Sequence, residues 1–471
     1  MLTLAHVIEA LTGRQVEGGR QVITDAAIDS RLVIPGALFV ALKGERADGH
    51  EYVAAAFERG ASVALLEREV PAVGRMLDLR QPVAAEALAG LEPPVSLRVE
   101  SSLSALHSIA RHWRNQLSVR VIGITGSVGK STTKELTADV LETRYRTMRN
   151  PGNLNNEIGL PLSMLRLTET HERAVLEMGL YVPGEIAFLC ELARPTVGVI
   201  TNVGPVHLER AGSMEAIVAG KTELIASLPP APEGVAVLNS DEPLVRSMAQ
   251  HTQASIVYYG LTSDADLWAS EVEGQGLEGV RFVLHYRGEA VHVRVPLLGR
   301  HSVHTALRAA AVGLIEGLTW EEIVAGMQNT QSQLRLVAVQ GPSGSLLLDD
   351  TYNAAPPSVI AALNLLAELD GRKVAVLGDM LELGEYEERG HRMVGARTAE
   401  VADALVAVGE RARWIADEAE KAGLHEVVTL KDSAEAVSHL RRSIGEGDVV
   451  LVKGSRGMHM DQIIVDLEER S

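Results

Sequence analysis

The segment that most restricts the fold is VIGITGSVGKSTT at 121–133, which places glycines and a Lys-Ser pair between a strand pattern and a helix pattern. Apolar and β-branched residues at 118–122 predict a strand. Leu136, Val140 and Leu141 then recur at helical spacing. A glycine-rich turn at a helix N-terminus directs backbone N–H groups at one anion, and the helix end adds about half a positive charge. The segment therefore predicts a phosphate-binding loop in an α/β sheet.

Two side chains of this loop suit nucleotide phosphates. Lys130 would supply a positive charge to the β- and γ-phosphates, and Ser131 a hydroxyl ligand for Mg²⁺. The spacing is unusual, because Ile124 stands where the usual loop has its first glycine. The glycines present are Gly123, Gly126 and Gly129. An ordinary strand-turn-helix connection could share this pattern, but the Lys-Ser-Thr-Thr run favours phosphate binding.

Length and composition restrict the class of protein. The 471 residues are enough for about three domains of roughly 150 residues each. The chain carries 44 basic and 62 acidic residues, a net charge of −18, which argues against nucleic acid as a partner. Cys190 is the only cysteine, which excludes an intrachain disulfide and indicates a reducing compartment. Without a secretory signal pattern or an apolar run of membrane-spanning length, we expect a cytoplasmic monomer with no membrane span.

Alternating strand and helix patterns divide the chain into three segments. Residues 1–98 predict a small α/β domain with strands at 37–42 and 62–66. Residues 99–332 predict a larger parallel sheet around the phosphate loop. Residues 333–471 predict a doubly wound sheet with helices between its strands. The expected fold class is therefore α/β, with a central P-loop-type domain and a C-terminal Rossmann-like domain.

Several polar segments are candidates for binding or catalysis. A short apolar run ends in Glu177, at a position where nucleotide hydrolases hold Mg²⁺. His207 lies in a Gly/Pro loop, and the amide-rich loop at 150–157 can both donate and accept hydrogen bonds. Polar residues at 29–31 and 44–50 flank the first strand, where ordinary surface loops would explain them equally well.

Lys221 is placed unusually for a lysine. Ser213 is a candidate N-cap for a helix whose apolar stripe includes Ile217 and Leu224, and Lys221 falls inside this stripe. Its stem could lie on the core with the amine in water, or the amine could be desolvated, partly neutral and reactive. An ammonium has no lone pair, so Lys221 could ligate a metal only after conversion to a carboxylate-like group.

The C-terminal segment directs two polar runs to one edge of its sheet. The strand before 349–353 and the strand before 453–456 both end in polar residues, and ligands of open α/β sheets bind beyond the carboxyl ends of strands. No Asn-Lys-x-Asp guanine signature occurs in the sequence, which favours ATP over GTP. The residues thus indicate an ATP-using enzyme.

Taken together, the motifs resemble those of the Mur ligases of peptidoglycan synthesis. The resemblance runs from about residue 29 to 456 and so covers nearly the whole chain. Its blocks are Asp29-Ser30-Arg31 with 44–50, the loop at 125–131, Asn153 to Gly159, Asp350 to Ala354 and Lys453 to Arg456. It implies an N-terminal domain that binds a UDP-linked substrate, and ATP-dependent ligation through an acyl phosphate. The implied substrates are UDP-N-acetylmuramoyl-tripeptide, D-alanyl-D-alanine and ATP.

The resemblance also assigns roles to residues. It implies a carbamate on Lys221 and two Mg²⁺ sites. The implied catalytic residues are Lys130, Glu177, His207 and Lys221, and the implied metal ligands are Ser131, Glu177, His207 and the modified Lys221. The implied ATP-binding residues are Thr125, Gly126, Ser127, Val128, Gly129, Lys130, Ser131, Thr132, Thr305, Arg335, Asp350 and Asn353. The implied substrate-binding residues are Ser30, Arg31, Asp48, His50, Asn153, Asn155, Asn156, Lys453 and Arg456.

The sequence departs from the family pattern in three places. Ser302 and Thr305 replace the two asparagines of the family's Asn-x-x-Asn helix, the second of which is associated with adenine, and Ala355 replaces an asparagine before Pro356. Two alternative functions stay open. One is another ligase of the superfamily, which adds a different amino acid to a UDP-muramoyl peptide or glutamate to a folate. The other is a nucleotide-dependent switch or transport ATPase that forms no bond.

Overall fold

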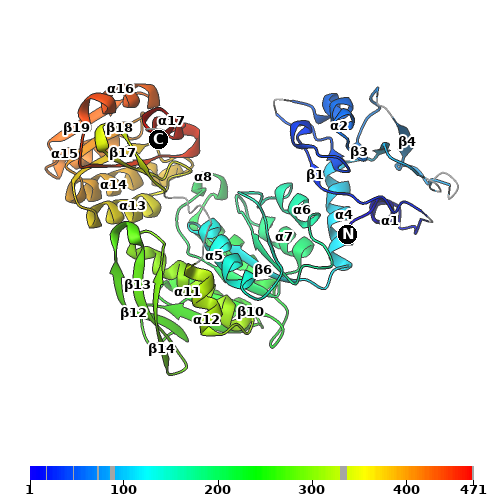
Figure 1. Cartoon of the computed structure of the whole chain (residues 1–471), viewed down its shortest axis with the longest axis horizontal. Coiled ribbons are helices and arrows are strands. Elements are labelled where there is room, and N and C mark those ends of the chain that lie inside the picture. Colours follow the sequence, from blue (N-terminus) through cyan, green and yellow to red (C-terminus); the bar gives the residue numbers. More distant parts are fainter. Residues whose placement is uncertain are drawn as a thin grey trace. The chain divides into compact units, whose positions relative to one another are not determined.

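The computed structural model (Figure 1) describes residues 1–16, 18–45, 47–71, 74–84, 88, 91–328 and 337–468. They form two compact units. The first comprises Met1–Gly123, Tyr145–Gly179 and Glu185–Thr196. The second comprises Ile124–Arg144, Leu180–Gly184 and Val197–Ser471. Strand β6 (Arg120–Thr125) carries the chain from the first unit into the second, so the phosphate loop belongs to the second unit.

The N-terminal part of the first unit contains a five-stranded parallel sheet of order β1-β2-β3-β5-β4. Its strands are β1 (Ala26–Ala27), β2 (Leu38–Val40), β3 (Val63–Leu66), β4 (Arg75–Asp78) and β5 (Val95–Arg98), and its helices include α1 (Leu4–Thr12), α2 (Val53–Glu58) and α4 (Ser102–Asn115). Strands β2 and β3 are buried along their whole length, as continuous apolar runs require. The two strands expected at 37–42 and 62–66 are confirmed.

A nine-stranded sheet has members in both units. In the first unit, β7 (Thr147–Arg149) pairs in parallel with β8 (Arg173–Glu177). In the second unit the strand order is β14-β13-β12-β11-β10-β9. Strands β9 (Val197–Ile200), β10 (Val235–Asn239), β11 (Ser255–Gly260) and β12 (Leu267–Gly274) pair in parallel, whereas β13 (Val280–Tyr286) and β14 (Glu289–Val295) extend the sheet antiparallel. The sequence analysis expected the parallel part and did not identify the antiparallel extension.

Helices of the nine-stranded sheet carry five of the candidate site residues, Lys130, Ser131, Thr132, Lys221 and Thr305. They include α5 (Lys130–Glu142), α6 (Gly159–Met164), α7 (Glu185–Ala193), α8 (Leu208–Ala211), α9 (Met214–Ala226), α10 (Pro243–Ser247), α11 (Val303–Ile315) and α12 (Trp320–Gln328). Helix α9 begins as expected, because the Ser213 hydroxyl accepts a hydrogen bond from Ala216 N at 3.1 Å.

The C-terminal sheet has six strands in the order β15-β16-β20-β17-β18-β19. They are β15 (Val337–Gln340), β16 (Leu346–Asp349), β17 (Arg372–Gly378), β18 (Ala404–Val408), β19 (Glu426–Leu430) and β20 (Asp448–Lys453). All pairs are parallel except β15 with β16. Helices α13 (Pro356–Glu368), α14 (Glu387–Val401) and α15 (Arg413–Lys421) bury one apolar face of this sheet (Figure 1). Helices α16 (Ser433–Ser443) and α17 (Asp461–Leu467) bury the other, which confirms the doubly wound sheet.

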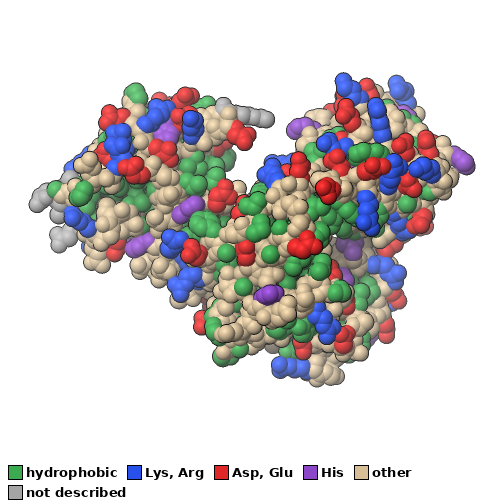
Figure 2. Space-filling view, turned by 180° about the vertical axis from the view of Figure 1, so that it is seen from behind, with side chains coloured by type: hydrophobic (Ala, Val, Ile, Leu, Met, Phe, Trp, Pro, Cys, Tyr) green, Lys and Arg blue, Asp and Glu red, His purple; other side chains and the backbone are tan. Residues whose placement is uncertain are grey.

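Three α/β sheets match the expected fold class. The domain limits expected near residues 98 and 332 stay a prediction, and the second limit falls in 329–336, outside the described residues. No helix among the described residues is long and apolar enough to cross a bilayer. Acidic and basic side chains are mixed over the face of the molecule that Figure 2 shows.

Candidate active site

The phosphate loop lies between β6 and α5 and is held by residues that follow β9. The Thr201 hydroxyl donates to Val128 O at 2.7 Å. The Asn202 amide accepts from Val128 N at 2.8 Å and donates to Val128 O at 2.9 Å. Ser127 N donates to Asn202 O at 3.0 Å, and Ser127 Oγ donates to Gly204 O at 2.9 Å. Several hydrogen bonds from the residues after β9 therefore restrain this short segment.

Two glycines make this shape possible. Gly126 has φ +148, and a Cβ at this position would overlap the Thr201 hydroxyl and lie 2.9 Å from Thr201 Cβ. Gly129 has φ +80, a left-handed conformation in which side chains are strained, and it immediately precedes the first residue of α5. The glycine spacing that differs from the usual loop therefore still serves a sharp turn into a helix N-terminus.

Lys130 is the first residue of α5 and folds back over the loop. Its Nζ donates to Gly126 O at 2.9 Å and to Ser127 O at 3.2 Å. Since Lys130 lies on the helix N-terminus with its charge over the loop, it is well placed to meet a phosphate.

A cavity of about 310 Å³ lies beside the loop, within the second unit. Its walls come from the loop, from the N-terminal turns of α11, from residues that follow β16, and from the last residue of β20. The lining residues used below are Gly129, Thr132, Thr305, Arg308, Asp350 and Lys453. The phosphate loop and the polar ends of the C-terminal strands therefore face one cavity.

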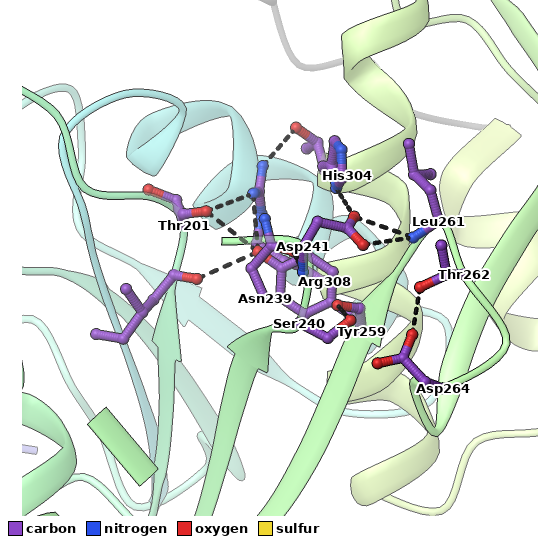
Figure 3. A network of polar contacts seen from close by, with 12 residues as sticks. Thr201, Asn239, Ser240, Asp241, Tyr259, Leu261, Thr262, Asp264, His304 and Arg308 are labelled. Atoms are coloured by element: carbon purple, nitrogen blue, oxygen red, sulfur yellow. Dashed lines mark hydrogen bonds and ion pairs between the residues drawn. The ribbon is translucent and has the colours of Figure 1, made fainter. Parts of the chain in front are cut away.

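Helix α11 carries the residues that depart from the family pattern. Ser302 Oγ donates to Leu298 O at 2.7 Å, so its hydroxyl bonds the backbone just before α11. Thr305 is buried, and its hydroxyl accepts a hydrogen bond from Arg308 Nη2 at 2.9 Å. Arg308 extends from α11 toward Thr201 and Tyr259 (Figure 3), a residue and a network that the sequence analysis missed.

Lys221 lies inside α9 with 4% of its surface exposed. Because so little of Lys221 is exposed, the alternative with the amine in water does not hold. Among the described residues, its amine also makes no hydrogen bond or ion pair. Burial holds the pKa of Lys221 well below its usual value, and the nearby charge of Lys130 lowers the pKa further. This environment therefore disfavours the charged ammonium form of Lys221.

His207 is held by a glutamate from the C-terminal part of the second unit. Its Nδ1 lies 2.5 Å from Glu382 Oε2, and both residues have positive φ values, 59 for His207 and 64 for Glu382. Tyr181 packs edge-on against the imidazole at 4.8 Å between ring centroids. Burial lowers the pKa of His207, while Glu382 opposes this shift. Because Nδ1 is engaged, Nε2 is the ring nitrogen left to meet a ligand. No local sequence signal could have identified Glu382.

Glu177 ends β8 in the first unit, as expected, and is 1% exposed. Asn155 Nδ2 donates to Glu177 Oε1 at 2.7 Å. The Asn150 side chain accepts from Glu177 N at 2.8 Å and donates to Glu177 O at 3.2 Å. The amide-rich loop therefore positions the Glu177 carboxylate, a role that the resemblance did not imply for Asn155.

The other two asparagines of the amide-rich loop lie differently. Asn156 Oδ1 accepts from Gly159 N at 2.9 Å at the start of α6, which is a local capping bond. Asn153 is exposed, and its carbonyl accepts from Asn155 N at 2.8 Å. Their expected contacts with substrate stay a prediction.

The C-terminal candidates surround an ion pair between the buried Lys453 and the half-buried Asp350. Lys453, 2% exposed, pairs with Asp350 at 2.7 Å and donates to Asn353 O at 2.8 Å. Arg456 is exposed at the end of the sheet. Ala355 is buried and is the N-cap position of α13, where it leaves no side-chain oxygen for a ligand. Arg335, expected to contact the nucleotide, lies outside the described residues.

The N-terminal candidates lie in the first unit, in two short turns. Arg31 donates to Asp29, and these bonds lower the pKa of Asp29 to about 2, while Ser30 is buried. His50 Nε2 accepts from Glu67 N at 2.9 Å, so Nδ1 carries the proton that bonds Asp48 Oδ1 at 2.6 Å. Bonds from His50 hold the pKa of Asp48 well below its usual value. Both turns are held by local hydrogen bonds to an aspartate.

The candidate metal ligands come from both units. Glu177 lies in the first unit, and Ser131, His207 and Lys221 lie in the second. Among the described residues, no group of three or more His, Cys, Asp or Glu side chains could hold a metal by itself.

Comparisons with known proteins match the chain along most of its length. The model described as "Mur ligase family, catalytic domain" matches residues 22–92, "Mur ligase middle domain" matches 124–313, and "Mur ligase, glutamate ligase domain" matches 334–456. The chain is 37% identical to UDP-N-acetylmuramoyl-tripeptide–D-alanyl-D-alanine ligase of Bacillus subtilis, covering 95% of this chain and 94% of the relative.

Two solved structures are also similar over nearly the whole chain. A crystal structure of MurF from Acinetobacter baumannii has a TM-score of 0.83 and 31% identity, covering 99% of both chains. The structure of MurF ligase from Thermotoga maritima in complex with ADP has a TM-score of 0.78 and 28% identity, covering 97% of both chains. With three family models matched in order and full-length relatives above 30% identity, this chain belongs to the Mur ligase family.

Proposed function

We propose that this protein is an ATP-dependent ligase that joins D-alanyl-D-alanine to UDP-N-acetylmuramoyl-tripeptide. The single observation that carries the proposal is one cavity lined both by the phosphate loop and by Asp350 and Lys453 of the C-terminal sheet. A nucleotide on the loop would thus present its phosphates toward the C-terminal residues. The choice of substrates is supported by the full-length relative from Bacillus subtilis, which is a UDP-N-acetylmuramoyl-tripeptide–D-alanyl-D-alanine ligase.

The proposed chemistry activates a carboxylate before the new bond forms. A carboxylate is a poor acyl donor, because its negative charge makes its carbon unreactive toward an attacking amine. Transfer of the ATP γ-phosphoryl group to it gives an acyl phosphate with a good leaving group. The amine of D-alanyl-D-alanine then attacks the acyl carbon, loses a proton, and inorganic phosphate departs, leaving an amide and ADP. Lys130 offsets charge on the transferring phosphoryl group, and exclusion of water protects the intermediate.

The environment of Lys221 fits the proposed carbamate. An ammonium buried beside Lys130, without a carboxylate partner among the described residues, is unfavourable, whereas a carbamate would be negatively charged. We propose Ser131, Glu177, His207 and the modified Lys221 as Mg²⁺ ligands. The bound Mg²⁺ would offset the negative charge of the ATP phosphates. Without it, Glu382 still orients His207 and Asn155 still orients Glu177.

Carbon-13 NMR in labelled bicarbonate tests the modification independently of catalysis. The wild-type protein should show a carbamate signal that Lys221→Ala lacks, and Lys130→Ala should keep the signal. Lys221→Ala should also lose nearly all ligase activity. Full activity with an unmodified Lys221 would refute the carbamate.

Phosphate release tests the function itself. We expect release from ATP only when UDP-N-acetylmuramoyl-tripeptide and D-alanyl-D-alanine are both present, with a product heavier by the joined dipeptide. Equal phosphate release in the absence of both UDP-N-acetylmuramoyl-tripeptide and D-alanyl-D-alanine would favour a nucleotide-dependent switch. Release with a single amino acid in place of the dipeptide would favour another ligase of the superfamily. We place this reaction in the cytoplasm.

A further inference from the structure

Arg308 is a buried cation that the proposed chemistry does not use. It lies on α11 with 4% of its surface exposed. Its Nε donates to Thr133 Oγ1 at 3.0 Å and its Nη2 to Thr305 Oγ1 at 2.9 Å. Its Nη1 donates to Thr201 O and to Tyr259 Oη, both at 3.2 Å (Figure 3). The guanidinium is therefore fixed by α5, by the residue after β9, by β11 and by its own helix.

One N–H group of the Arg308 guanidinium is not used by these four hydrogen bonds. A guanidinium has five N–H groups, and the four bonds above use one on Nε, two on Nη1 and one on Nη2. The remaining N–H is therefore on Nη2. This atom is also the part of Arg308 nearest the phosphate loop, because a Cβ built on Gly129 would lie 3.5 Å from it. Arg308 and Gly129 line the same cavity.

The charge of Arg308 is not matched by a direct ion pair. Among the described residues, none of its four partners is a carboxylate. Glu242 is a nearby acidic residue, but its carboxylate accepts from Val203 N at 3.2 Å, and burial raises its pKa despite the opposing charge of Arg308. Buried cations are rarely left without an anion, so this side of the cavity favours a negatively charged ligand.

We infer that Arg308 binds the phosphate chain of the nucleotide through its remaining Nη2 N–H group. The inference rests on the proposed use of ATP. It adds a fixed cation from α11 to the loop amides and Lys130, which approach the phosphates from β6 and α5. Since four hydrogen bonds already hold the guanidinium in place, binding a phosphate costs little further side-chain entropy. Arg308 is thus a binding residue on a helix position where the sequence showed no motif.

The test compares two variants that both disturb the hydrogen bonds of Arg308 but differ in charge. Arg308→Gln and Arg308→Lys both disturb the four hydrogen bonds, and only lysine keeps the positive charge. We expect Arg308→Gln to weaken binding of ADP and of pyrophosphate by about 10- to 100-fold, the range for a hydrogen bond to a charged group. Arg308→Lys should lose clearly less. Adenosine affinity, measured by competition on the same samples, should stay within about threefold.

Arg114 supplies a matched control. It is also a buried arginine, and it donates to three backbone carbonyls, Ala193 O, Leu117 O and Val119 O. Arg114→Gln should reduce thermal stability and leave ADP affinity unchanged. Because ADP, pyrophosphate and adenosine are compared on one folded sample, a loss of stability in Arg308→Gln does not hide the result. Equal losses for adenosine and ADP, equal losses for the two Arg308 variants, or unchanged ADP affinity would overturn the inference. Those results would leave the phosphate-release test of the proposed function unaffected.

Discussion

Gly126→Ala should damage the phosphate loop more than any ordinary glycine substitution. Gly126 has φ +148, and an added Cβ would overlap the Thr201 hydroxyl and lie 3.1 Å from Asn202 N. Thr201 cannot easily turn away, because its hydroxyl holds Val128 O at 2.7 Å. The substitution therefore strains the backbone and disrupts the contact that shapes the loop.

The size of the effect follows from three contributions. A non-glycine residue at positive φ costs about 1–2 kcal/mol. Overpacking against fixed atoms adds about 1–3 kcal/mol, and loss of the Thr201–Val128 hydrogen bond about 1 kcal/mol. The folded state should therefore lose about 3–6 kcal/mol. Gly423→Ala isolates the first contribution, because Gly423 has φ +101 and no atom within 4 Å of an added Cβ.

Urea denaturation with and without ADP measures this difference. A chain of several domains does not unfold in one step, so the transition to follow is the one that ADP shifts. With a urea dependence of about 3 kcal/mol per molar, Gly126→Ala should lower that midpoint by about 1 M or more. Gly423→Ala should lower its own transition by less than half as much and leave ADP affinity unchanged.

The double variant Gly126→Ala with Thr201→Ala checks the cause. It removes the overlapping hydroxyl, so it should recover part of the stability that Gly126→Ala loses. The reasoning fails if Gly126→Ala is as stable as Gly423→Ala and binds ADP as tightly as the wild type.

Three further predictions address other residues. Burial lowers the pKa of His304 to about 4 from 6.5, so the folded state binds fewer protons than the unfolded state between these pH values. The free energy of unfolding should therefore fall by at most about 3 kcal/mol as the pH drops through this window. His304→Gln should remove that part of the pH dependence, measured by urea titrations at several pH values. Lys453→Met leaves the half-buried Asp350 carboxylate without its partner and should cost about 1–3 kcal/mol by chemical denaturation, and adding Asp350→Asn should restore at least half; no recovery would contradict the ion-pair explanation. Asn155→Leu removes a donor to the Glu177 carboxylate and should cost about 1–3 kcal/mol in thermal melts, whereas an unchanged melting temperature would show that the bond contributes nothing.

Features with a local signal could be predicted from the sequence. The phosphate loop was identifiable because strand, glycines, lysine and helix follow one another directly, and the structure begins α5 at Lys130 as expected. Lys221 stood out because a charged residue interrupted an apolar stripe, and its burial confirms that the stripe faces the core. The strands expected at 37–42 and 62–66 contain β2 and β3, because each is a continuous apolar run next to a turn.

Features made by distant residues could not be predicted in this way. Glu382 is 175 residues from His207, and no pattern near either residue indicates their contact. Arg308 occupied an apolar helix without any motif, and its partners come from three other segments of the chain. The strands at 280–286 and 289–295 did carry a usable signal, a hairpin turn between two apolar runs, which the sequence analysis did not use.

The folded-back position of Lys130 has a consequence for inactive variants. Its amine donates to the carbonyls of Gly126 and Ser127 and so joins the first residue of α5 to the turn before it. Replacing Lys130 by a neutral residue therefore disturbs two contacts within the loop and also removes a charge that a phosphate would meet. An inactive variant made at this position would alter the loop itself, whereas one made at a residue remote from the loop would leave these contacts intact.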